Sequence, residues 1–327
     1  MNAKIDSNDP LRVSVVIPTF GDPENVRRAV RSAMNQDLPP DQYEIIVVDS
    51  SPDDRVVRTV EALRPGARCA LRVLTKPAEG PGPSRNLGAG AARGEVIALM
   101  DSDCIATPGW LRFGLAAFGE RVGLVQGRTL PVPDVPLGIF TWYVRVEQEN
   151  HIYEAANLFY CKTAFAQAGG FDTAFNDAAE HVMGGEDVDL AWRVKRLGWT
   201  SRFSAEALVY HEVQRLPFLR WVYIRRHYIW PLVARRVPEI RAFFWMRWFF
   251  DRHQAALLPA LIGAVWAVWI PAALLLAVPY IISRGSEPTR TLRGPLRIVR
   301  VAAYSLRDVA SLFLLVAGSV RFRTLVL

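Results

Sequence analysis

Strand-like and helix-like patterns alternate in the first hundred residues, and this alternation restricts the fold more than any other feature. Short apolar runs predict strands at residues 13–17, 44–48, 71–74 and 96–100. Helical patterns lie between them, at residues 23–36, 53–63 and 84–93. Continuously apolar strands joined by helices need a mostly parallel sheet that is covered on both faces. The sequence therefore predicts a doubly wound α/β domain, in which ligands bind beyond the carboxyl ends of the strands.

Charge is divided unevenly along the chain. The whole sequence carries a net charge of +7, but residues 1–214 have a balance of −6 and residues 215–327 a balance of +13. Such asymmetry predicts two domains with these boundaries, the second of which meets an anionic partner such as nucleic acid or a membrane surface. A hydrophobic fraction of 51% with 22% charged residues excludes a disordered or fibrous chain.

The three cysteines, Cys69, Cys104 and Cys161, are far apart and form no C-x-x-C pair. This spacing argues against a disulfide framework and against a structural zinc site. Residues 1–12 are polar and contain no apolar stretch long enough for a secretory signal. We therefore expect the amino-terminal half of the chain in the cytosol.

The basic half begins with a segment rich in aromatic residues and arginines. Residues 215–253 contain eleven aromatic side chains and nine arginines, a mixture suited to lipid headgroups and also to single-stranded nucleic acid. The 28 residues 255–282 carry no charge. As one helix they would be about 42 Å long, which exceeds the roughly 30 Å hydrocarbon core of a bilayer. This run favours a membrane partner over nucleic acid.

Three prolines interrupt the uncharged run, and arginines flank it on both sides. Because positive charge is normally retained in the cytoplasm, we expect a re-entrant hairpin bent near Pro271, with a tilted single span as the alternative. A second apolar stretch, residues 309–320, follows Arg307 and Asp308. We expect it to be interfacial, or to cross the membrane inside a helix bundle that accommodates those two charges.

The first candidate for chemistry is Asp101-Ser102-Asp103, directly after the predicted strand 96–100. Two carboxylates at a strand end can converge on one divalent cation, which prefers oxygen ligands and can also hold substrate phosphates. An isolated D-x-D is more often a capped turn, but its place at the ligand-binding edge favours the metal interpretation. A lone histidine is also more often structural, yet His211 ends a short apolar run and neutral imidazole is a good metal ligand.

The second candidate is the acidic segment 184–189, in which a glycine pair precedes Glu186-Asp187-Val188-Asp189. A carboxylate beside flexible glycines can reach a substrate hydroxyl and act as a base. The same acidic residues also complement the dipole of the helix that follows. We expect both functions together, with Asp187 as the base and Asp189 as a cap.

The glycine-rich segment 80–88 matches neither of the common phosphate-binding patterns. It has no G-K-[ST] ending and no strand-adjacent G-x-G-x-x-G, which disfavours a P-loop NTPase and a Rossmann dehydrogenase. The remaining interpretation is a flexible loop that leads into a helix, whose amino end and Arg85 could meet a diphosphate.

Six motifs together resemble the family 2 glycosyltransferases of the GT-A fold, over roughly residues 13–212. The motifs are Val15-Val16-Ile17-Pro18-Thr19-Phe20, Ile46-Val47-Val48-Asp49-Ser50, Ser84-Arg85-Asn86-Leu87-Gly88, Asp101-Ser102-Asp103, Gly169-Gly170-Phe171-Asp172 and Gly185-Glu186-Asp187-Val188-Asp189-Leu190-Ala191-Trp192-Arg193. Each is weak alone, and six in this order are specific. The resemblance implies a Rossmann-like, mostly parallel sheet, followed here by C-terminal amphipathic and membrane-embedded helices. The Q-x-x-R-W motif of processive synthases is absent, which argues against extension of a long polymer.

The resemblance also implies roles for individual residues. Those expected at the donor are Pro18, Thr19, Phe20, Asp49, Arg85, Asp101, Ser102 and Asp103. Asp49 would read the base, while Asp101, Asp103 and His211 would hold Mg²⁺ or Mn²⁺. Asp187 matches the expected catalytic base, with Glu186 as the competing assignment. The residues expected on the acceptor side are Asn157, Gly185, Trp192 and Arg193.

The implied activity is the metal-dependent, inverting transfer of a sugar from a nucleotide-sugar, and UDP-sugars are the commonest donors in that family. A membrane-seated tail favours a lipid-linked or glycan acceptor at the cytoplasmic face of the membrane. The alternative is a membrane-tethered scaffold that binds a nucleotide-sugar without chemistry. The completeness of the candidate site favours an enzyme, and we expect no nucleic-acid partner.

Overall fold

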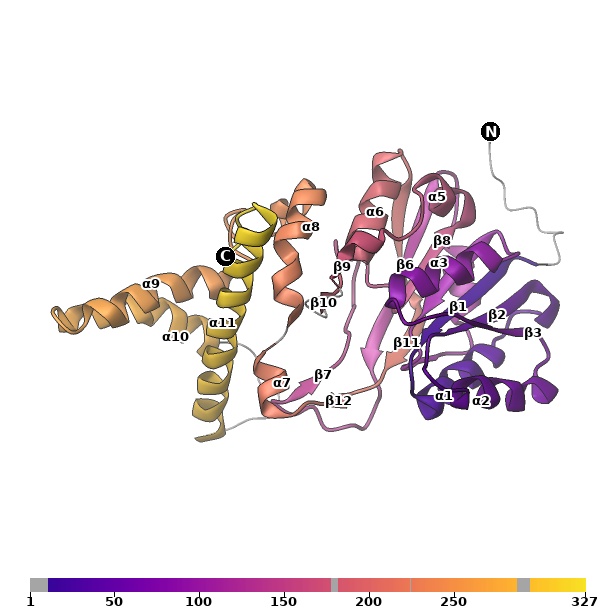
Figure 1. Ribbon diagram of the computed structural model, residues 1–327, viewed down its shortest axis with the longest axis horizontal. Helices are drawn as coiled ribbons and strands as arrows, with labels where there is room; N and C mark the ends of the chain where they lie inside the picture. Colours follow the sequence, from indigo (N-terminus) through magenta and orange to yellow (C-terminus); the bar gives the residue numbers. More distant parts are fainter. Residues whose placement is uncertain (1–10, 178–181, 224, 287–294) are drawn as a thin grey trace. The chain divides into compact units, whose positions relative to one another are not determined.

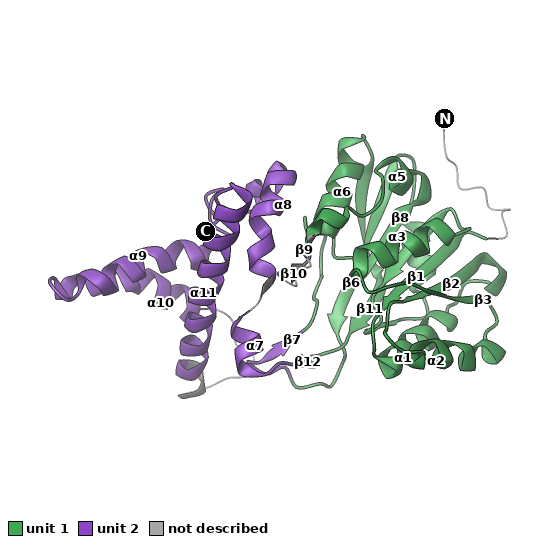
Figure 2. Ribbon diagram, in the orientation of Figure 1, with its two compact units in different colours: residues 1–136, 143–176, 185–214 green, residues 137–142, 177–184, 215–327 purple. Residues whose placement is uncertain are grey.

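The computed structural model describes residues 11–177, 182–223, 225–286 and 295–327. The chain divides into two compact units, shown in different colours in Figure 2. Unit 1 comprises residues 1–136, 143–176 and 185–214, and unit 2 comprises residues 137–142, 177–184 and 215–327. Unit 1 holds the α/β sheet, and unit 2 is mainly helical.

An eight-stranded sheet forms the centre of unit 1, with the strand order β3-β2-β1-β4-β8-β6-β11-β5 (Figure 1). Its strands are β1 (Val13–Thr19), β2 (Tyr43–Asp49), β3 (Ala70–Thr75), β4 (Val96–Met100), β5 (Cys104–Ala106), β6 (Val122–Pro131), β8 (Asn157–Cys161) and β11 (Thr200–His211). Strands β1 to β4 pair in parallel, as do β6 and β11. Only β8 and β5 run antiparallel to their neighbours within this sheet.

Helices cover both faces of the sheet, as the sequence predicts. The helices of unit 1 are α1 (Pro23–Met34), α2 (Arg55–Leu63), α3 (Pro81–Ala91), α4 (Trp110–Ala116), α5 (Lys162–Gln167) and α6 (Glu186–Arg196). Alternate residues of β1 belong to two different cores: Val15 and Ile17 pack with α1, α2 and α4, whereas Val16 packs with α3, α5 and α6. Because successive side chains point to opposite faces, a strand buried on both sides must be apolar throughout.

The predicted boundaries are accurate to within a few residues, and the largest error is at the start of α3. This helix begins at Pro81 and not at residue 84, because proline has no N–H to lose and its fixed φ suits the first helical turn. Gly88 lets α3 lie close against β1, since a Cβ at this position would come within 2.4 Å of Val16 Cγ1. Close contact between α3 and β1 holds the helix that carries Arg85 over the sheet.

Short elements connect the larger ones. They are the 3-10 helices η1 (Pro40–Gln42), η2 (Arg64–Gly66) and η3 (Thr173–Phe175), and the two-residue strands β7 (Thr141–Trp142), β9 (Asn176–Asp177), β10 (Val182–Met183) and β12 (Gln214–Arg215). Two pairs of these strands, β7 with β12 and β9 with β10, form separate small sheets.

Unit 2 contains the basic and apolar parts of the chain. Its helices are α7 (Phe218–Val222), η4 (Arg225–Ile229), α8 (Trp230–Arg236), η5 (Pro238–Ala242), α9 (Arg252–Trp266), η6 (Pro271–Ala277), α10 (Val278–Gly285) and α11 (Pro295–Phe322). The uncharged run reverses direction between α9 and η6, and both η6 and α10 pack back against α9. The chain therefore forms a hairpin near Pro271, and residues 255–282 do not form one continuous helix.

Helix α11 is longer than the sequence predicts. The apolar stretch 309–320 lies inside it, and the helix continues through Arg307 and Asp308 without a break. Asp308 does not interrupt it because the Arg284 guanidinium pairs with the Asp308 carboxylate, with Nε 2.6 Å from Oδ2. Among the described residues, α11 is the one helix long and apolar enough to cross a membrane, over Ile298–Phe322.

Candidate active site

The carboxyl ends of β1 and β2 form the expected nucleoside side of the site. Thr19 and Asp49 are register partners at the ends of these two parallel strands, and the backbone N–H of Ser50 donates to the Thr19 carbonyl at 3.1 Å. The buried Asp49 carboxylate accepts the Ser51 N–H through Oδ1 at 3.0 Å, while the Phe20 ring is 63% exposed. An exposed ring and a fixed carboxylate at the ends of two paired strands suit stacking against a base and reading of its N–H groups.

Arg85 lies at the centre of a cluster of carboxylates. Its Nη2 donates to Asp101 Oδ1 at 2.7 Å, and its Nη1 lies 3.4 Å from Glu186 Oε1 and 3.5 Å from Asp187 Oδ1. The guanidinium is also 5.6 Å from the centre of the Phe171 ring. Burial opposes its charge, but the three carboxylates raise the pKa of Arg85 above its ordinary value. This arginine is permanently charged and connects the β4 end of the site with α6.

Asp187 has the electrostatic environment of a base that acts near neutral pH. Burial raises the pKa of its carboxyl, and the negative charges of Glu186 and Asp101 raise it further. Arg85 and the Ala155 N–H, which donates to Asp187 Oδ2 at 3.0 Å, act in the opposite direction. The balance raises the pKa of Asp187 to about 7, and a general base is most effective when its pKa is near the working pH.

Accessibility separates Asp187 from its neighbour Glu186. The Asp187 side chain is 21% exposed and the Glu186 side chain 9%. Both side chains begin helix α6, after Gly185 in the left-handed conformation with φ of 93°. Since a base must contact the acceptor hydroxyl, the more accessible Asp187 is the better candidate of the two.

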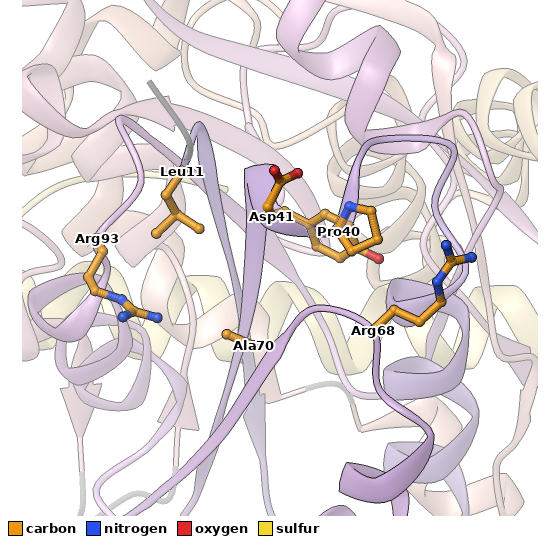
Figure 3. Close-up of a pocket in the computed structure, with 7 residues that line it drawn as sticks. Leu11, Pro40, Asp41, Arg68, Ala70 and Arg93 are labelled. Atoms are coloured by element: carbon orange, nitrogen blue, oxygen red, sulfur yellow. The ribbon is translucent and has the colours of Figure 1, made fainter. Parts of the chain in front are cut away.

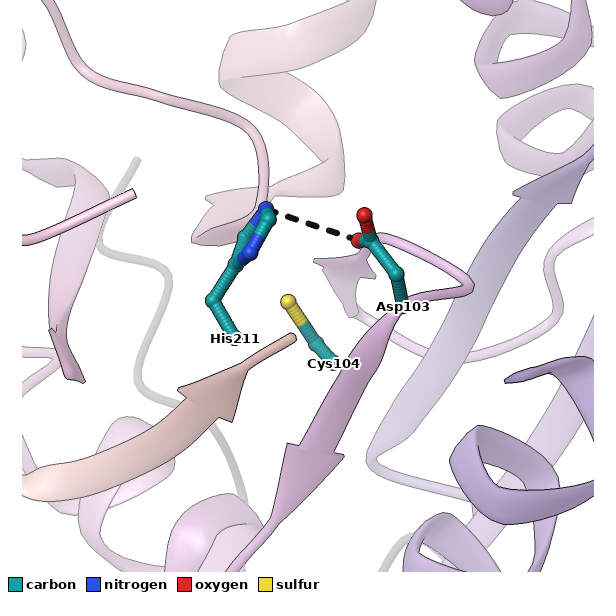
Figure 4. A group of neighbouring side chains, drawn as sticks. All are labelled: Asp103, Cys104 and His211. Atoms are coloured by element: carbon teal, nitrogen blue, oxygen red, sulfur yellow. Dashed lines mark ion pairs between the residues drawn. The ribbon is translucent and has the colours of Figure 1, made fainter. Parts of the chain in front are cut away.

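Asp103 and His211 lie together at the other end of the cluster, as Figure 4 shows. His211 Nε2 is 3.5 Å from Asp103 Oδ1, and Gln214 Nε2 donates to Asp103 Oδ2 at 3.1 Å. His211 Nδ1 is 2.8 Å from the Glu212 carbonyl oxygen. A carbonyl only accepts, so Nδ1 carries a proton and Nε2 is the ring nitrogen that faces the Asp103 carboxylate.

The local field around Asp103 also fits a divalent cation. Burial raises the pKa of Asp103, and so does the charge of Asp101, although His211 lowers it. A carboxylate destabilised by burial and by a second carboxylate gains most from a nearby cation. The carboxylate oxygens of Asp103 and Asp101 suit Mg²⁺ or Mn²⁺. Ser102 lies in the turn between Asp101 and Asp103, at the same edge of the sheet.

Cys104 is a neighbour of this group that the sequence did not identify. Its Sγ lies with donor atoms of Asp103 and His211 in a cluster whose atoms are all within 4.8 Å of one another. Antiparallel pairing of β5 with β11 places Cys104 opposite His211, and a cysteine next to D-x-D was the available signal. Burial, Asp101 and Asp103 raise the pKa of the thiol well above its ordinary value, so it stays protonated at neutral pH.

Asn157 does not belong to the acceptor side, contrary to the sequence-based expectation. Its amide nitrogen donates to the carbonyl oxygens of Arg128 and Ala207, each at 2.8 Å. Its Oδ1 accepts the Trp110 indole N–H, also at 2.8 Å. A buried amide with these three bonds connects β8 with β6, β11 and α4 and is engaged within the protein.

The Arg193 side chain is also engaged within the protein. It pairs with Asp189 through Nε at 2.7 Å and donates through Nη2 to the Gly170 carbonyl at 2.7 Å. The expected cap at Asp189 is wrong, because α6 has Gly185 at its N-cap and no side-chain capping bond. Arg193 and Asp189 therefore hold the Gly169-Gly170 turn against α6. Trp192 lies next to them, and its indole donates to the His151 carbonyl at 3.2 Å.

A separate hollow opens at the opposite, amino-terminal edge of the sheet (Figure 3). Its lining residues are Leu11, Pro40, Asp41, Tyr43, Arg68, Ala70 and Arg93. Tyr43 and Ala70 are the first residues of β2 and β3, so this hollow is at the wrong end of the strands for the predicted donor site. The candidate chemistry is confined to the carboxyl edge.

Comparison with known sequences gives the family. The sequence pattern of Glycosyl transferase family 2 matches residues 14–183, more than half of the chain. The chain belongs to this family. The match includes the donor-side motifs and Asp103, and it ends before Asp187 and His211.

Two curated relatives share the family 2 region. The chain is 23% identical to the glycosyltransferase AglE of Haloferax volcanii over 208 residues, which cover 61% of this chain and 66% of the relative. It is 30% identical to the pre-mycofactocin glycosyltransferase of Mycobacterium tuberculosis over 233 residues, which cover 64% of this chain and 44% of the relative. The chain thus matches less than two thirds of the length of each.

Solved structures of glycosyltransferases have the same fold. A mannosyltransferase from Pyrobaculum calidifontis, in complex with GDP-Man and Mn²⁺, superimposes with a TM-score of 0.53 at 16% identity, covering 97% of this chain and 88% of that one. Residues 1–349 of S. aureus TarS, in complex with UDP-GlcNAc, give 0.52 at 19% identity, covering 96% and 93%. The family 2 chain therefore has the predicted GT-A fold.

Proposed function

We propose that the chain is a metal-dependent, inverting glycosyltransferase that transfers a sugar from a nucleotide-sugar to a hydroxyl of a lipid-linked or glycan acceptor at the cytoplasmic face of a membrane. The observation that carries this proposal is the environment of Asp187. Its carboxyl has a raised pKa of about 7, is partly accessible, and lies 3.5 Å from an arginine that also binds Asp101. The carboxyl edge of the sheet thus combines the candidate base Asp187, the permanently charged Arg85 and the candidate metal residues.

Donor binding is assigned to the carboxyl ends of β1, β2 and β4. Phe20 would stack on the base, and Asp49, with one oxygen already engaged by Ser51, would accept its N–H through the other oxygen. Pro18 and Thr19 would line the same pocket. Two neighbours of this fold are described with GDP-Man and with UDP-GlcNAc, and we propose a UDP-sugar as the first donor to test.

The metal assignment rests on the chemistry of the residues present. Asp103 and His211, with Asp101 beside them, would hold Mg²⁺ or Mn²⁺. When bound, such a cation stabilises the negative charge that develops on the departing diphosphate. Arg85 is a second positive charge at the same edge, and its connection to both Asp101 and Asp187 fixes it between the donor side and the base side.

The transfer itself needs one proton acceptor. Asp187 takes the proton from the acceptor hydroxyl while the hydroxyl oxygen bonds to the anomeric carbon. The bond between that carbon and the diphosphate oxygen breaks at the same time, so the nucleoside diphosphate leaves with its electron pair. Attack from the face opposite the leaving group inverts the anomeric configuration. Ala155 holds Asp187 through Oδ2, and Oδ1 is buried 3.5 Å from Arg85 Nη1.

The domain assignment follows the two expected parts of the chain. Residues 1–214 are proposed as the nucleotide-sugar domain and residues 215–327 as a membrane-associated region. Exposed apolar residues on unit 2, among them Val268 and Trp269, support a membrane location, and a membrane location favours a lipid-linked acceptor. The second candidate, a tethered nucleotide-sugar-binding scaffold, is an outcome of the same experiment.

A donor panel tests this proposal. UDP-, GDP- and dTDP-sugars are incubated with the full chain, with and without Mn²⁺ and with and without membrane extract, and released nucleotide is measured. We expect release with one nucleotide class, increased by Mn²⁺ and by the extract. Binding of a nucleotide-sugar without release under any condition would favour the scaffold and contradict the enzyme.

A further inference from the structure

Apolar side chains cover the outside of the hairpin formed by α9, η6 and α10. Val268 is 78% exposed and Trp269 71% exposed, and both lie at the turn. Other exposed apolar residues of the hairpin are Leu261, Ile262, Val265, Trp266, Ile270, Leu274, Leu275, Leu276, Val278, Ile281 and Ile282. No charged residue lies between Gln254 and Ser283. An apolar surface of this extent on a soluble protein marks a contact with a partner or a membrane.

The hairpin is too short to cross a bilayer. Helix α9 has 15 residues and is therefore about 22 Å long, against a hydrocarbon core of about 30 Å. The returning segment packs tightly on it, because a Cβ at Gly263 would come within 2.3 Å of the Ala273 carbonyl oxygen. Its charged ends, Arg252 and Arg284, are thus at the same level. The hairpin can enter one leaflet with both ends in the headgroup layer.

The base of the hairpin is joined to the middle of α11. Asp308 accepts from Arg284 Nε at 2.6 Å and from the Tyr280 hydroxyl at 2.7 Å. Its backbone carbonyl accepts from Gln254 Nε2 at 3.2 Å. Asp308 is near the centre of the candidate span Ile298–Phe322. If α11 crossed the bilayer, this junction and the charged base of the hairpin would lie at the bilayer centre.

Arginines lie on α11 or contact its end. Arg300 lies over the Tyr304 ring at 5.1 Å, and Arg307 lies over the Trp221 ring at 4.9 Å. Near the other end, Arg235 and Arg241 donate to the carbonyl oxygens of Phe322 at 3.3 Å and of Leu325 at 3.0 Å. Of these four arginines, Arg307 lies near the centre of the candidate span, where an arginine is strongly unfavourable on insertion scales. The headgroup layer accommodates all of them at once.

We propose that α11 lies in the plane of the membrane at headgroup level and that the α9–α10 hairpin inserts its turn into one leaflet. In Figure 1 the hairpin projects away from α11, which runs across its base. The proposed occupant of the apolar surface is the acyl layer of an anionic leaflet, whose phosphates complement the surrounding arginines. This inference deepens the membrane association put forward under the proposed function and rests on it.

Cysteine labelling on sealed vesicles tests the arrangement. The full chain is added to preformed vesicles of phosphatidylcholine and phosphatidylglycerol, and an impermeant maleimide is added outside. Three single additions are compared: Ser286→Cys and Arg323→Cys on either side of α11, and Val268→Cys at the turn, with the unmodified chain as background. We expect residues 286 and 323 to be labelled without detergent, and residue 268 only after detergent is added.

The outcomes distinguish the proposed orientation of α11 from membrane association as such. Protection of either residue 286 or residue 323 would show that α11 crosses the bilayer, which overturns this inference and leaves membrane association intact. Failure of the chain to float with the vesicles would overturn the membrane association itself, and a dimer in solution would then assign the apolar surface to a second copy.

A matched pair of charge insertions measures the contribution of the turn. Val268→Asp should weaken vesicle binding at least about tenfold, because an aspartate inside the acyl layer is strongly unfavourable. Leu197→Asp replaces an exposed apolar residue of unit 1, which is 50% exposed, and should leave vesicle binding unchanged. Equal binding by both variants would contradict insertion of the turn.

Discussion

The two edges of the central sheet hold buried carboxylates in opposite ways. At the amino-terminal edge, Glu44 on β2 is fully buried and pairs with both Arg93 at 2.9 Å and Arg72 at 3.1 Å. It also accepts from the Ser14 hydroxyl at 2.8 Å and the Arg93 N–H at 2.8 Å. Burial raises its pKa, but these partners lower it more, and the net pKa is below the ordinary value.

At the carboxyl edge the ratio of arginines to carboxylates is reversed. One arginine, Arg85, is shared by Asp101, Glu186 and Asp187. Burial raises the pKa of Asp187 to about 7 because the shared arginine offsets it only in part, and burial raises the pKa of Asp103 as well. A carboxylate with enough partners stabilises the fold, whereas one with too few partners is available to bind a cation or accept a proton. The difference between the edges is the physical basis for placing the chemistry at one of them.

The largest expected effect is the loss of the base. Asp187→Asn keeps the shape of the side chain and removes its ability to accept a proton, so transfer should fall by about 10²–10⁴-fold. Donor affinity, measured by calorimetry with the nucleotide-sugar, should stay within about twofold of wild type because the donor-side residues are unchanged. Glu186→Gln is the matched control and should retain most of the activity. Loss of transfer in Glu186→Gln alone would reverse the assignment.

Removal of the metal residue should have the next largest effect. Asp103→Ala is expected to lower nucleotide release by about 10³-fold, which corresponds to the several kcal/mol that a cation contributes at a leaving group. Stimulation by Mn²⁺, measured as the ratio of rates with and without the ion, should disappear with it. A variant that is still stimulated by Mn²⁺ to the wild-type extent would place the cation elsewhere.

Replacement of a carboxylate at the amino-terminal edge should lower stability and leave catalysis intact. Glu44→Gln breaks a buried ion pair and should lower the free energy of unfolding by about 3 kcal/mol, measured by urea denaturation at neutral pH. Turnover per folded molecule should be unchanged. Reduced turnover at unchanged stability would contradict the assignment of stability to the amino-terminal edge and of catalysis to the carboxyl edge.

The pH dependence of that loss has a defined sign. The pKa of Glu44 is lowered in the folded state, so its contribution to stability is present above the unfolded-state pKa of about 4.3 and is lost as the pH falls through the folded-state value. The stability difference between wild type and Glu44→Gln should therefore be constant near neutral pH and shrink below about pH 4. A difference that grows on acidification would contradict the lowered pKa.

The smallest predicted effect is the pH profile of the transfer reaction. Asp187 acts only when ionised, and its pKa is raised to about 7. The value of kcat/KM should fall about tenfold for each pH unit below that point and level off above it. Glu44→Gln should have the same profile as wild type. A rate that does not change between about pH 5 and pH 8 would exclude a base with this pKa.

Much of the sheet could be predicted because its strands are buried on both faces. Val15 and Val16 pack into different cores, so the whole run is apolar and is visible as a block in the sequence. Asp101 and Asp103 were also recognisable, since a carboxylate pair directly after such a block lies at the ligand-binding edge. The chemistry of these positions follows from local sequence.

Contacts between distant segments could not be predicted. The pairing of Cys104 with His211 depends on the antiparallel contact between β5 and β11, which joins residues about a hundred positions apart. The roles of Asn157 and Arg193 in binding backbone carbonyls are not encoded by their neighbours in the sequence. Continuation of α11 through Asp308 depends in the same way on Arg284, a residue of another helix.

The most direct test of the central claim is the anomeric configuration of the product. A donor found in the nucleotide-sugar panel is used with its acceptor, and the coupling of the anomeric proton in the new glycosidic bond is measured by NMR. Single displacement with Asp187 as the base predicts a configuration opposite to that of the donor sugar. Retention of the donor configuration would contradict this mechanism.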